Sequence, residues 1–390
     1  MSETLAAPNA EPVERPALHA AEDTSDPLAR ELLDSLYELT VRREASDLHL
    51  RPGAIAKIRV DGALEDATTA PLEPGLVSQM VAATMSPATR MEFLERLEAD
   101  YAVVVEGLGR FRANAFRTRG ADGVIMRRVR DEPTPLTGLD LPPAVFDLAR
   151  KQRGLVLVTG PTGSGKSTTL AGMIDLINHE RQVHILTIED PIEVMHTDRV
   201  ATVTQRELGS DTRNWPNALR AAMRQDPDVI LIGELRDRDT VHAAMTAAET
   251  GHLVMGSMHT NDARETVHRL IEFFPAEEQQ RVRAVLSGAL EGVVCQRLIR
   301  RADGGRVVVS EVAVRDARFA EAVADPEKTH LVPDIIASGE YSGMQTFDQH
   351  LFTLVTTGVI DEETARNTAS KPHDLAVMLR RAGWNSTLPV

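Results

Sequence analysis

Cysteine, aromatic residues and long apolar runs are all scarce in this sequence. Its 390 residues include one cysteine, Cys295, which excludes a disulfide framework within the chain and a zinc site built from several cysteines. No apolar run approaches the roughly 20 residues that a membrane-spanning helix needs. The acidic, Ala- and Pro-rich N-terminus has no apolar core of the kind that marks a secretory signal. We therefore expect a cytoplasmic protein.

Basic residues are also in the minority. The 43 Lys and Arg against 58 Asp and Glu give a net charge of −15, and aromatic residues make up 4% of the chain. Sequence-independent binding to DNA or RNA needs a basic surface and often stacking aromatic side chains. The composition therefore argues against a nucleic-acid motor, although a local basic patch can lie within an acidic total.

A glycine-rich loop follows a short apolar run in the middle of the chain. Residues 160–167 read Gly-Pro-Thr-Gly-Ser-Gly-Lys-Ser, which is the phosphate-binding pattern G-x-x-x-x-G-K-[ST]. The preceding run, residues 155–158, is typical of a strand buried on both faces of a parallel sheet. An apolar stripe predicts a helix over residues 168–177. A chance glycine-rich turn is the alternative, but it would not explain this order of strand, loop and helix.

The loop residues have expected contacts with a nucleoside triphosphate. Backbone N–H groups can close around phosphate oxygens at the positive end of the helix. Lys166 is expected to reach the β- and γ-phosphates, and the Ser167 hydroxyl is expected to ligate Mg²⁺. The expected nucleotide-binding residues are Gly160, Pro161, Thr162, Gly163, Ser164, Gly165, Lys166, Ser167 and Thr168.

Three further segments carry acids or histidine next to candidate strands, where an open α/β sheet places its active-site crevice. Residues 187–193 contain three carboxylates and end in Glu193, and the apolar run 229–232 is soon followed by Glu234. An acid that follows such an apolar strand, as Glu234 does, can hold Mg²⁺ directly or through water. His259, in residues 251–262, could sense the γ-phosphate or orient a catalytic carboxylate. Taken alone, these segments could instead be a solvated loop, a surface acid and a structural histidine.

Arginines are crowded onto two candidate strands in the first third of the chain. Strand alternation places Arg110 and Arg112 on one face, and Arg117 and Arg119 on one face of their own stretch. These are either surface arginines or arginine fingers for ATP bound beside this domain or in a neighbouring subunit. The full set is Arg110, Arg112, Arg117, Arg119, Arg127 and Arg128.

The patterning predicts an α/β protein with two folded domains. We expect a disordered leader (residues 1–26), a small α+β domain with an antiparallel sheet (27–130), a Pro- and Gly-containing linker (131–138) and an α/β domain with a mostly parallel sheet (139–390). Helices are expected at 27–43 and 76–97, and the region 265–390 is expected to be largely helical with one strand at 306–314. The other expected strands are 48–50, 55–60, 101–105, 109–119, 124–129, 155–159, 184–188, 201–204, 229–232 and 252–257.

Taken in order, these segments closely resemble the secretion-superfamily ATPases, and most of all the PilT/PilU-type twitching-motility (pilus retraction) ATPases. The resemblance covers residues 28–380. It implies a PAS-like N-terminal domain joined by a flexible linker to a RecA-like P-loop ATPase domain, assembled as a homohexameric ring. The segments that carry it are residues 45–50, 58–62, the phosphate loop, 187–193, 232–237, 251–261 and 343–348.

The resemblance also implies roles for individual residues. Glu193 would be the general base or water-positioning group, Glu234 would serve Mg²⁺, and His259 would belong to the histidine box. Arg112 and Arg127 best match the arginines that contact nucleotide at the domain and subunit interface, with Arg110 and Arg117 as weaker matches. The implied protein is a cytoplasmic ATPase, peripheral to the inner face of the cell membrane, that hydrolyses ATP to drive pilus retraction through an inner-membrane platform protein.

Two other functions stay open. One is a pilus-assembly or secretion ATPase of the same superfamily, which usually carries a longer N-terminal region and a four-cysteine zinc insertion. The other is a regulatory nucleotide-binding subunit that works with a paralogous ATPase, against which Lys166, Glu193 and Glu234 argue. One segment matches the retraction ATPases poorly. They often carry Ala-Ile-Arg-Asn-Leu-Ile-Arg-Glu, whereas residues 316–323 of this chain read Asp-Ala-Arg-Phe-Ala-Glu-Ala-Val.

Overall fold

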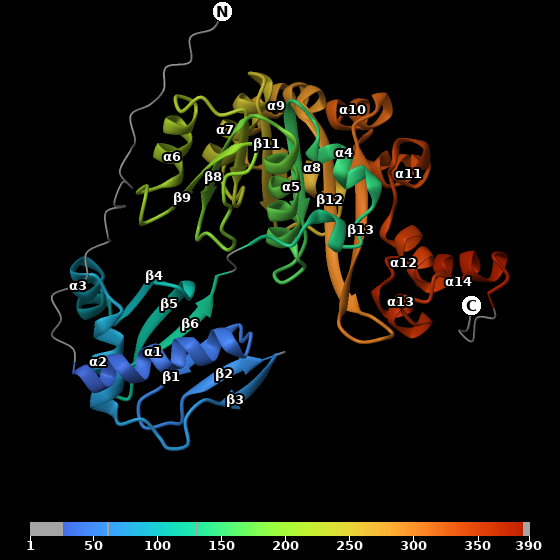
Figure 1. Cartoon of the computed structure of the whole chain (residues 1–390). Coiled ribbons are helices and arrows are strands. Elements are labelled where there is room, and N and C mark those ends of the chain that lie inside the picture. The colour runs from blue at the N-terminus through green and yellow to red at the C-terminus, as the bar shows by residue number, and fades with distance from the viewer. Residues whose placement is uncertain (1–25, 61, 130–131, 385–390) are drawn as a thin grey trace, which may run out of the picture. The chain divides into compact units, whose positions relative to one another are not determined.

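The computed structural model describes residues 26–60, 62–129 and 132–384 and divides the chain into two compact units (Figure 1). Unit 1 is Met1–Asp131 and unit 2 is Glu132–Val390. The expected leader lies outside the described residues except for Asp26, whose side chain accepts the Leu28 N–H and caps α1. Among the helices of the described ranges, none combines the length and apolar character needed to cross a membrane.

Unit 1 is a six-stranded antiparallel sheet with its core on one face. The strand order is β3-β2-β1-β6-β5-β4, and every neighbouring pair is antiparallel, as expected. Alternation along β5 directs Phe111, Ala113 and Ala115 into a core shared with the helices. The elements are α1 (Pro27–Arg42), β1 (Asp47–Leu50), β2 (Lys57–Val60), β3 (Ala63–Asp66), α2 (Pro74–Ala83), α3 (Pro87–Arg96), β4 (Glu98–Val105), β5 (Gly109–Thr118) and β6 (Ala121–Arg128).

The sequence predictions for unit 1 include one wrong helix and omit one strand. The single helix expected over residues 76–97 is two helices, α2 and α3, because proline is tolerated only in the first turn of a helix. Pro87 lies in that first turn of α3, and the Ser86 hydroxyl caps it by accepting the Thr89 N–H at 3.1 Å. The edge strand β3 was not expected, since its side chains are mostly exposed and give no apolar alternation.

Unit 2 contains a seven-stranded, mostly parallel sheet of order β13-β12-β7-β11-β10-β8-β9, as expected. The pairs formed by β7 to β12 are parallel, whereas β13 runs antiparallel to β12. Strand β12 was not predicted, because it follows helix α9 directly and no turn residue separates them. The strands are β7 (Gly154–Thr159), β8 (His184–Glu189), β9 (Thr202–Glu207), β10 (Val229–Ile232), β11 (Leu253–Met258), β12 (Leu290–Arg300) and β13 (Arg306–Val314).

Helices cover both faces of this sheet (Figure 1). Successive residues of β7 alternate between two cores: Val156 packs with α4 and α5, and Leu157 packs with α6 to α9. The helices are α4 (Pro143–Ala149), α5 (Lys166–Glu180), α6 (Trp215–Ala222), α7 (Arg238–Glu249), α8 (Ala263–Glu272), α9 (Ala276–Ala289), α10 (Ala317–Ala324), α11 (Val332–Ala337), α12 (Phe347–Thr356), α13 (Glu362–Thr368) and α14 (Pro372–Arg381).

Part of the expected linker packs onto unit 2. A 3-10 turn at Leu136–Gly138 buries Leu136 in the core beneath α5. Gly172 of α5 allows this close approach, because a Cβ there would lie 3.1 Å from the Thr134 carbonyl oxygen. The chain therefore joins the second unit from Glu132 onward, before the boundary expected at residue 139.

The C-terminal motif at residues 343–348 extends the edge of the sheet. Gln345 and Val312 exchange both backbone hydrogen bonds, at 2.8 and 3.1 Å, so the motif pairs with the outer side of β13. The Asp348 carboxylate then accepts the backbone N–H groups of Ser370 and Lys371, which lead into α14. The motif thus fastens the helical C-terminal region to the sheet.

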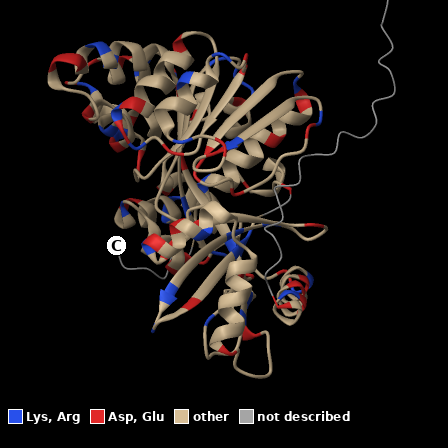
Figure 2. Ribbon diagram, turned by 90° about the vertical axis from the view of Figure 1, so that its left-hand side faces the viewer, with Lys and Arg blue, Asp and Glu red and all other residues tan. Residues whose placement is uncertain are grey.

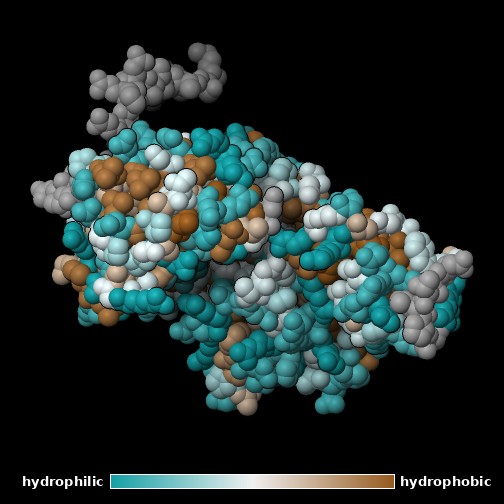
Figure 3. Space-filling model, turned by 90° about the horizontal axis from the view of Figure 1, so that it is seen from below, coloured by the Kyte–Doolittle hydropathy of each residue, from teal (hydrophilic) through white to brown (hydrophobic). Residues whose placement is uncertain are grey.

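The surface is polar and of mixed charge. Figure 2 shows acidic and basic residues interspersed within each unit, and the face seen in Figure 3 is mostly hydrophilic with separate apolar patches. On α3, Met91 and Leu94 are 73% and 61% exposed. They lie three residues apart and therefore share one side of that helix.

Candidate functional site

The phosphate loop connects β7 to α5 and depends on its glycines. Gly160, Gly163 and Gly165 have φ values of 143°, 80° and 92°, a region that other residues rarely adopt. At Gly160 a Cβ would also collide with the carbonyl oxygen of Gln296 on β12. The loop therefore lies against the neighbouring strand and delivers the chain to the first turn of α5, where backbone N–H groups lack helical partners.

Lys166 lies buried at the start of α5. Its Nζ donates to the carbonyl oxygens of Gly160 and Pro161, at 2.8 and 3.0 Å, which holds it along the loop. Burial lowers the pKa of Lys166, and the carboxylates of Glu234 and Glu193 act against that shift. The lysine thus lies within electrostatic reach of both predicted catalytic acids.

The predicted acids and histidine follow strands that end at one edge of the sheet. Strand β10 pairs with β8 and β11 through Ile188, Ile232 and Gly256, and β11 reaches the end of β7 through Met258 and Thr159. Because these strands are parallel, the segments after them meet at that edge.

Of the two histidines in residues 251–262, His259 is the one that lies beside a predicted catalytic acid. Its Nε2 lies 3.6 Å from Oε1 of Glu234. His252 lies just before the opposite end of β11, where its Nδ1 is 3.0 Å from the Ala247 carbonyl oxygen. The two histidines of this segment therefore have different surroundings, since His252 contacts the end of α7 and His259 lies beside Glu234.

The end of β8 and the turn after it carry one half-buried and one exposed glutamate. Glu193 is exposed, whereas Glu189 is half-buried and its Oε1 accepts hydrogen bonds from Thr187 Oγ1 at 2.7 Å and Gln205 Nε2 at 3.2 Å. Burial raises the pKa of Glu189, and the nearby Glu193 adds to that rise. Sequence reasoning gave no role to Glu189 or Gln205, because their contact depends on how β9 pairs with β8.

Two further contacts fix the same segment. The backbone N–H of Ile192 donates to Oε2 of Glu207 at 2.9 Å, and the peptide bond before Pro191 is cis. The carboxylate of Asp190 lies 3.6 Å from Arg236, which follows β10. Contacts with β9 and with the chain after β10 thus hold the turn that carries Glu193.

The groups at this edge fit a magnesium-bound nucleotide. Buried Ser164 Oγ has no hydrogen-bond partner within the described residues, and it lies in the loop beside Lys166. The exposed Ser167 hydroxyl and the Glu234 carboxylate offer the oxygen ligands that Mg²⁺ prefers. In the described ranges, no group of three or more His, Cys, Asp or Glu could hold a metal ion by itself.

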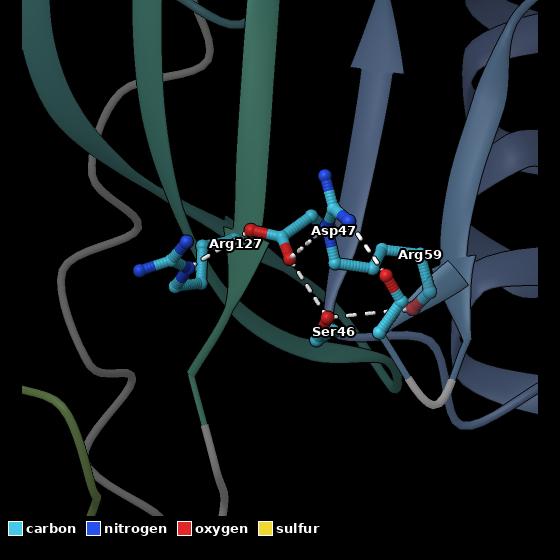
Figure 4. A network of polar contacts seen from close by, with 5 residues as sticks. Ser46, Asp47, Arg59 and Arg127 are labelled. Atoms are coloured by element: carbon cyan, nitrogen blue, oxygen red, sulfur yellow. Dashed lines mark hydrogen bonds and ion pairs between the residues drawn. The ribbon is translucent and has the colours of Figure 1, made fainter. Parts of the chain in front are cut away.

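A row of charged side chains crosses the sheet of unit 1, on the face away from its core. The register places Arg112 opposite Arg127, Arg127 opposite Asp47 and Asp47 opposite Arg59. Figure 4 shows Asp47 between the two arginines that it contacts: Arg127 Nε donates to it at 2.8 Å, and Arg59 Nε lies 3.6 Å away. This row was not predicted as a unit, because Asp47 and Arg127 are brought together by strand pairing alone.

Asp47 holds Arg127 in place. Its side chain is 5% exposed and accepts a second hydrogen bond from Ser46 Oγ at 2.7 Å. Burial tends to raise the pKa of Asp47, but the hydrogen bonds from Ser46 and Arg127 outweigh it and lower the pKa below its usual value. The guanidinium of Arg127 remains largely exposed, with a side-chain exposure of 72%, so it can contact a further group.

The other arginines of this unit differ in position. Strand alternation places Arg117 on the same face of β5 as its buried residues. Its Nε donates to Asp122 at 3.0 Å, and its guanidinium carbon lies 5.8 Å from the Phe93 ring centroid. It therefore lies on the opposite face from Arg112. Arg119 follows the end of β5 and has a φ of 50°. Of the weaker candidates, Arg110 alone shares the face of Arg112.

Comparisons with known proteins agree with this architecture. Residues 21–346 match the family model described as type II/IV secretion system protein. The chain is 42% identical over 342 residues to the type IV pilus retraction ATPase PilT of Pseudomonas aeruginosa, covering 88% of this chain and 99% of that protein. It is 41% identical over 320 residues to a twitching motility protein of Neisseria gonorrhoeae, covering 82% and 85%.

A solved structure shows the same likeness. The crystal structure of the pilus retraction motor PilT with bound ADP matches with a TM-score of 0.83 and 40% identity, covering 89% of this chain and 99% of that one. This match confirms the expected α/β fold class, with a smaller N-terminal unit followed by a P-loop unit.

The half-buried Glu189 leads to a pH-dependent prediction. Since burial raises its pKa above 4.5, the folded protein holds this proton to higher pH than the unfolded chain does. Wild-type stability is therefore lost as pH rises from 4.5 through the raised pKa, and Glu189→Gln avoids that loss. We expect the urea midpoint of the variant, relative to wild type, to increase as pH rises above 4.5.

Tryptophan fluorescence can follow this transition, because both tryptophans, Trp215 and Trp384, lie in unit 2. Glu180→Gln is the matched control, since the hydrogen bond from Arg150 lowers the pKa of the exposed Glu180 and the trend should have the opposite sign. A Glu189→Gln variant that loses stability relative to wild type as pH rises would show that the charged carboxylate is favoured.

Proposed function

The chain belongs to the type II/IV secretion system protein family, and from that membership we propose that it is an ATPase that hydrolyses ATP to power type IV pilus retraction. The observation that carries the proposal is the meeting of the phosphate loop, Glu193, Glu234 and His259 at one edge of the parallel sheet. The similarity to proteins described as pilus retraction and twitching motility proteins supports pilus retraction as the process that ATP hydrolysis would drive.

The loop residues would bind the phosphates of ATP. Backbone N–H groups of the loop and of the first turn of α5 would direct their partial positive charge at the phosphates, and Lys166 would move from the loop carbonyls to the β- and γ-phosphate oxygens. The Ser167 hydroxyl and the Glu234 carboxylate would hold Mg²⁺. When bound, Mg²⁺ neutralises charge that develops on the transferred phosphoryl group.

The acids and the histidine would act on the attacking water. Glu193 is exposed beyond the sheet edge and would orient the water and accept its proton. His259 lies 3.6 Å from Glu234 and would hold that carboxylate toward the metal. Catalysis of this kind consists mainly of positioning and charge stabilisation, so it needs groups that are held firmly. Each of these residues follows a buried strand, which supplies that support.

We further propose that unit 1 is a PAS-like domain, unit 2 is a RecA-like ATPase domain, and the protein works as a homohexamer. Arg112 and Arg127 would contact nucleotide at a subunit interface and stabilise charge on the phosphoryl group. Their side chains are 46% and 72% exposed, and Asp47 fixes the direction of Arg127. The ring would act at the cytoplasmic face of the cell membrane on an inner-membrane platform protein, with a paralogous ATPase as a further candidate partner.

Glu234→Gln is expected to abolish ATP hydrolysis while leaving nucleotide binding largely intact. The substitution removes the charge that serves Mg²⁺, whereas the loop and Lys166 that bind phosphate are unchanged. We expect a fall in kcat of at least about a hundredfold and an ADP affinity within a few-fold of wild type. A phosphate-release assay and isothermal titration with ADP measure the two quantities. Wild-type turnover by this variant would refute the catalytic assignment.

The arginine row allows a matched comparison. Arg112→Ala and Arg127→Ala should each lower kcat, because charge on the transferred phosphoryl loses a counter-charge, by about tenfold or more. Arg117→Ala is the control, since its guanidinium contacts Phe93 and Asp122 on the other face of the same sheet. Equal losses in all three variants would indicate a general loss of unit 1 structure and contradict the assignment.

The direction of pilus movement can be tested in cells. Deletion of the gene should give hyperpiliated cells that do not twitch, and a copy carrying Glu234→Gln should fail to restore twitching. Electron microscopy of pili and a stab assay for twitching measure these outcomes. Cells without pili would show instead that the protein drives pilus assembly.

A further inference from the structure

A buried carboxylate on β13 lies at the start of the helix that follows His259. Glu311 is 8% exposed, and its Oε1 accepts the backbone N–H of Ala263 at 2.9 Å. Ala263 is the first residue of α8 and is fully buried. The first N–H groups of a helix have no partner within the helix. Glu311 therefore satisfies a donor that solvent cannot reach.

The segment between His259 and α8 is tied to the same helix. The Thr260 and Thr266 hydroxyls are 2.7 Å apart, and Thr266 Oγ1 also donates to the Asp262 carbonyl oxygen at 2.7 Å. The Asp262 side chain accepts the Glu265 N–H and caps α8. Residues 260–262 are thus fixed to the first turn of α8, and Glu311 fixes that turn to β13.

This arrangement has a consequence for the imidazole that faces Glu234. His259 follows β11 directly and precedes the segment that α8 holds. A shift of the first turn of α8 would move this segment, and with it the 3.6 Å separation between His259 Nε2 and Glu234 Oε1. Displacements of about 1 Å in a catalytic group can cost about a hundredfold in rate.

We propose that Glu311 is a positioning residue for His259, which it holds toward Glu234 by anchoring the start of α8 to β13. The inference rests on the proposed ATPase function, since it concerns how the same site is kept in order. Glu311 does not touch nucleotide in this proposal and acts through α8.

The charge of Glu311 strengthens the anchor. A carboxylate at a helix N-terminus interacts with the positive end of the helix dipole, and a protonated carboxyl does so more weakly. Burial raises the pKa of Glu311 to about 7, with the Ala263 N–H lowering it and Asp262 raising it. The anchor therefore becomes weaker as pH falls below about 7.

Other charged groups face Glu311 from the elements packed against it. Arg297 of β12 lowers its pKa and Asp348 of α12 raises it. Cys295, opposite Glu311 in the ladder, has its own pKa raised by burial and by the Glu311 charge, so this thiol stays protonated near neutral pH. Three charged groups, Asp262, Arg297 and Asp348, thus act on the pKa of Glu311.

Two substitutions test the proposal in the full-length protein. Glu311→Gln keeps an accepting oxygen for Ala263 but removes the charge, and Glu311→Ala removes both. The ratio of wild-type to Glu311→Gln kcat should rise as pH increases through about 7. Glu311→Ala should lower kcat about tenfold with KM for ATP within about twofold, because the phosphate loop is unchanged.

Hydrogen–deuterium exchange without nucleotide gives a readout independent of turnover. Residues 259–266 should exchange faster in Glu311→Ala, while β7 should keep the wild-type rate. Glu311→Gln should restore most of the protection, because its amide oxygen can accept the Ala263 N–H. If Glu311→Ala does not fold, the pH dependence of the ratio of wild-type to Glu311→Gln kcat tests the proposal instead.

Glu291→Gln is the matched control. Glu291 is also buried, at 6% exposure, but it lies at the start of β12, where it contacts Lys151 and Arg315. In this variant residues 259–266 should keep the wild-type exchange rate, because Glu291 forms its ion pairs with residues outside α8. A pH-independent ratio for Glu311→Gln, or unchanged exchange at 259–266 in Glu311→Ala, overturns the proposal. A wild-type protein without ATPase activity would refute the proposed function, and the exchange experiment would still decide whether Glu311 anchors α8.

Discussion

The pairing of β7 with β11 and β12 is the constraint on which the site depends. All residues of β7 are buried, so its position is set by backbone hydrogen bonds on both sides and by the two cores that it separates. The phosphate loop starts where this pairing ends: Gly160 donates to the Met258 carbonyl oxygen and lies against Gln296. The segment with His259 and the hairpin with Glu311 are thus both positioned relative to one strand.

Much of this architecture could be predicted, because the strands of unit 2 are short apolar runs and those of unit 1 alternate. The failures have physical reasons. Apolar periodicity suggested one helix over residues 76–97, but the geometry of Pro87 divides it. Strand β12 follows α9 without a turn residue, and its pairing partner β7 lies over a hundred residues earlier. Local sequence contains neither the break between α9 and β12 nor that partner.

The same distinction applies to the site. Glu193, Glu234 and His259 could be expected at one edge because each follows a parallel strand, and the structure brings them there. The contacts of Asp47 with Arg127, of Glu189 with Gln205 and of Glu311 with Ala263 could not be expected. Each joins residues whose proximity is set by the register of strands or helices, and register depends on packing across the whole sheet. These contacts orient the groups that the motifs supply.

The pairing of Gln345 with Val312 has a consequence for the behaviour of the protein in a crowded assembly. An open strand edge offers unpaired N–H and C=O groups to any other strand, which is a common route to aggregation. Here the outer side of β13 is partly covered by residues 343–348 of the same chain. At the opposite edge, the carboxylates of Asp198 and Asp211 accept the backbone N–H groups of Val203 and Glu207 on β9. At both ends of the sheet, part of the backbone hydrogen-bonding capacity is thus taken up within the chain, which discourages edge-to-edge joining with another strand.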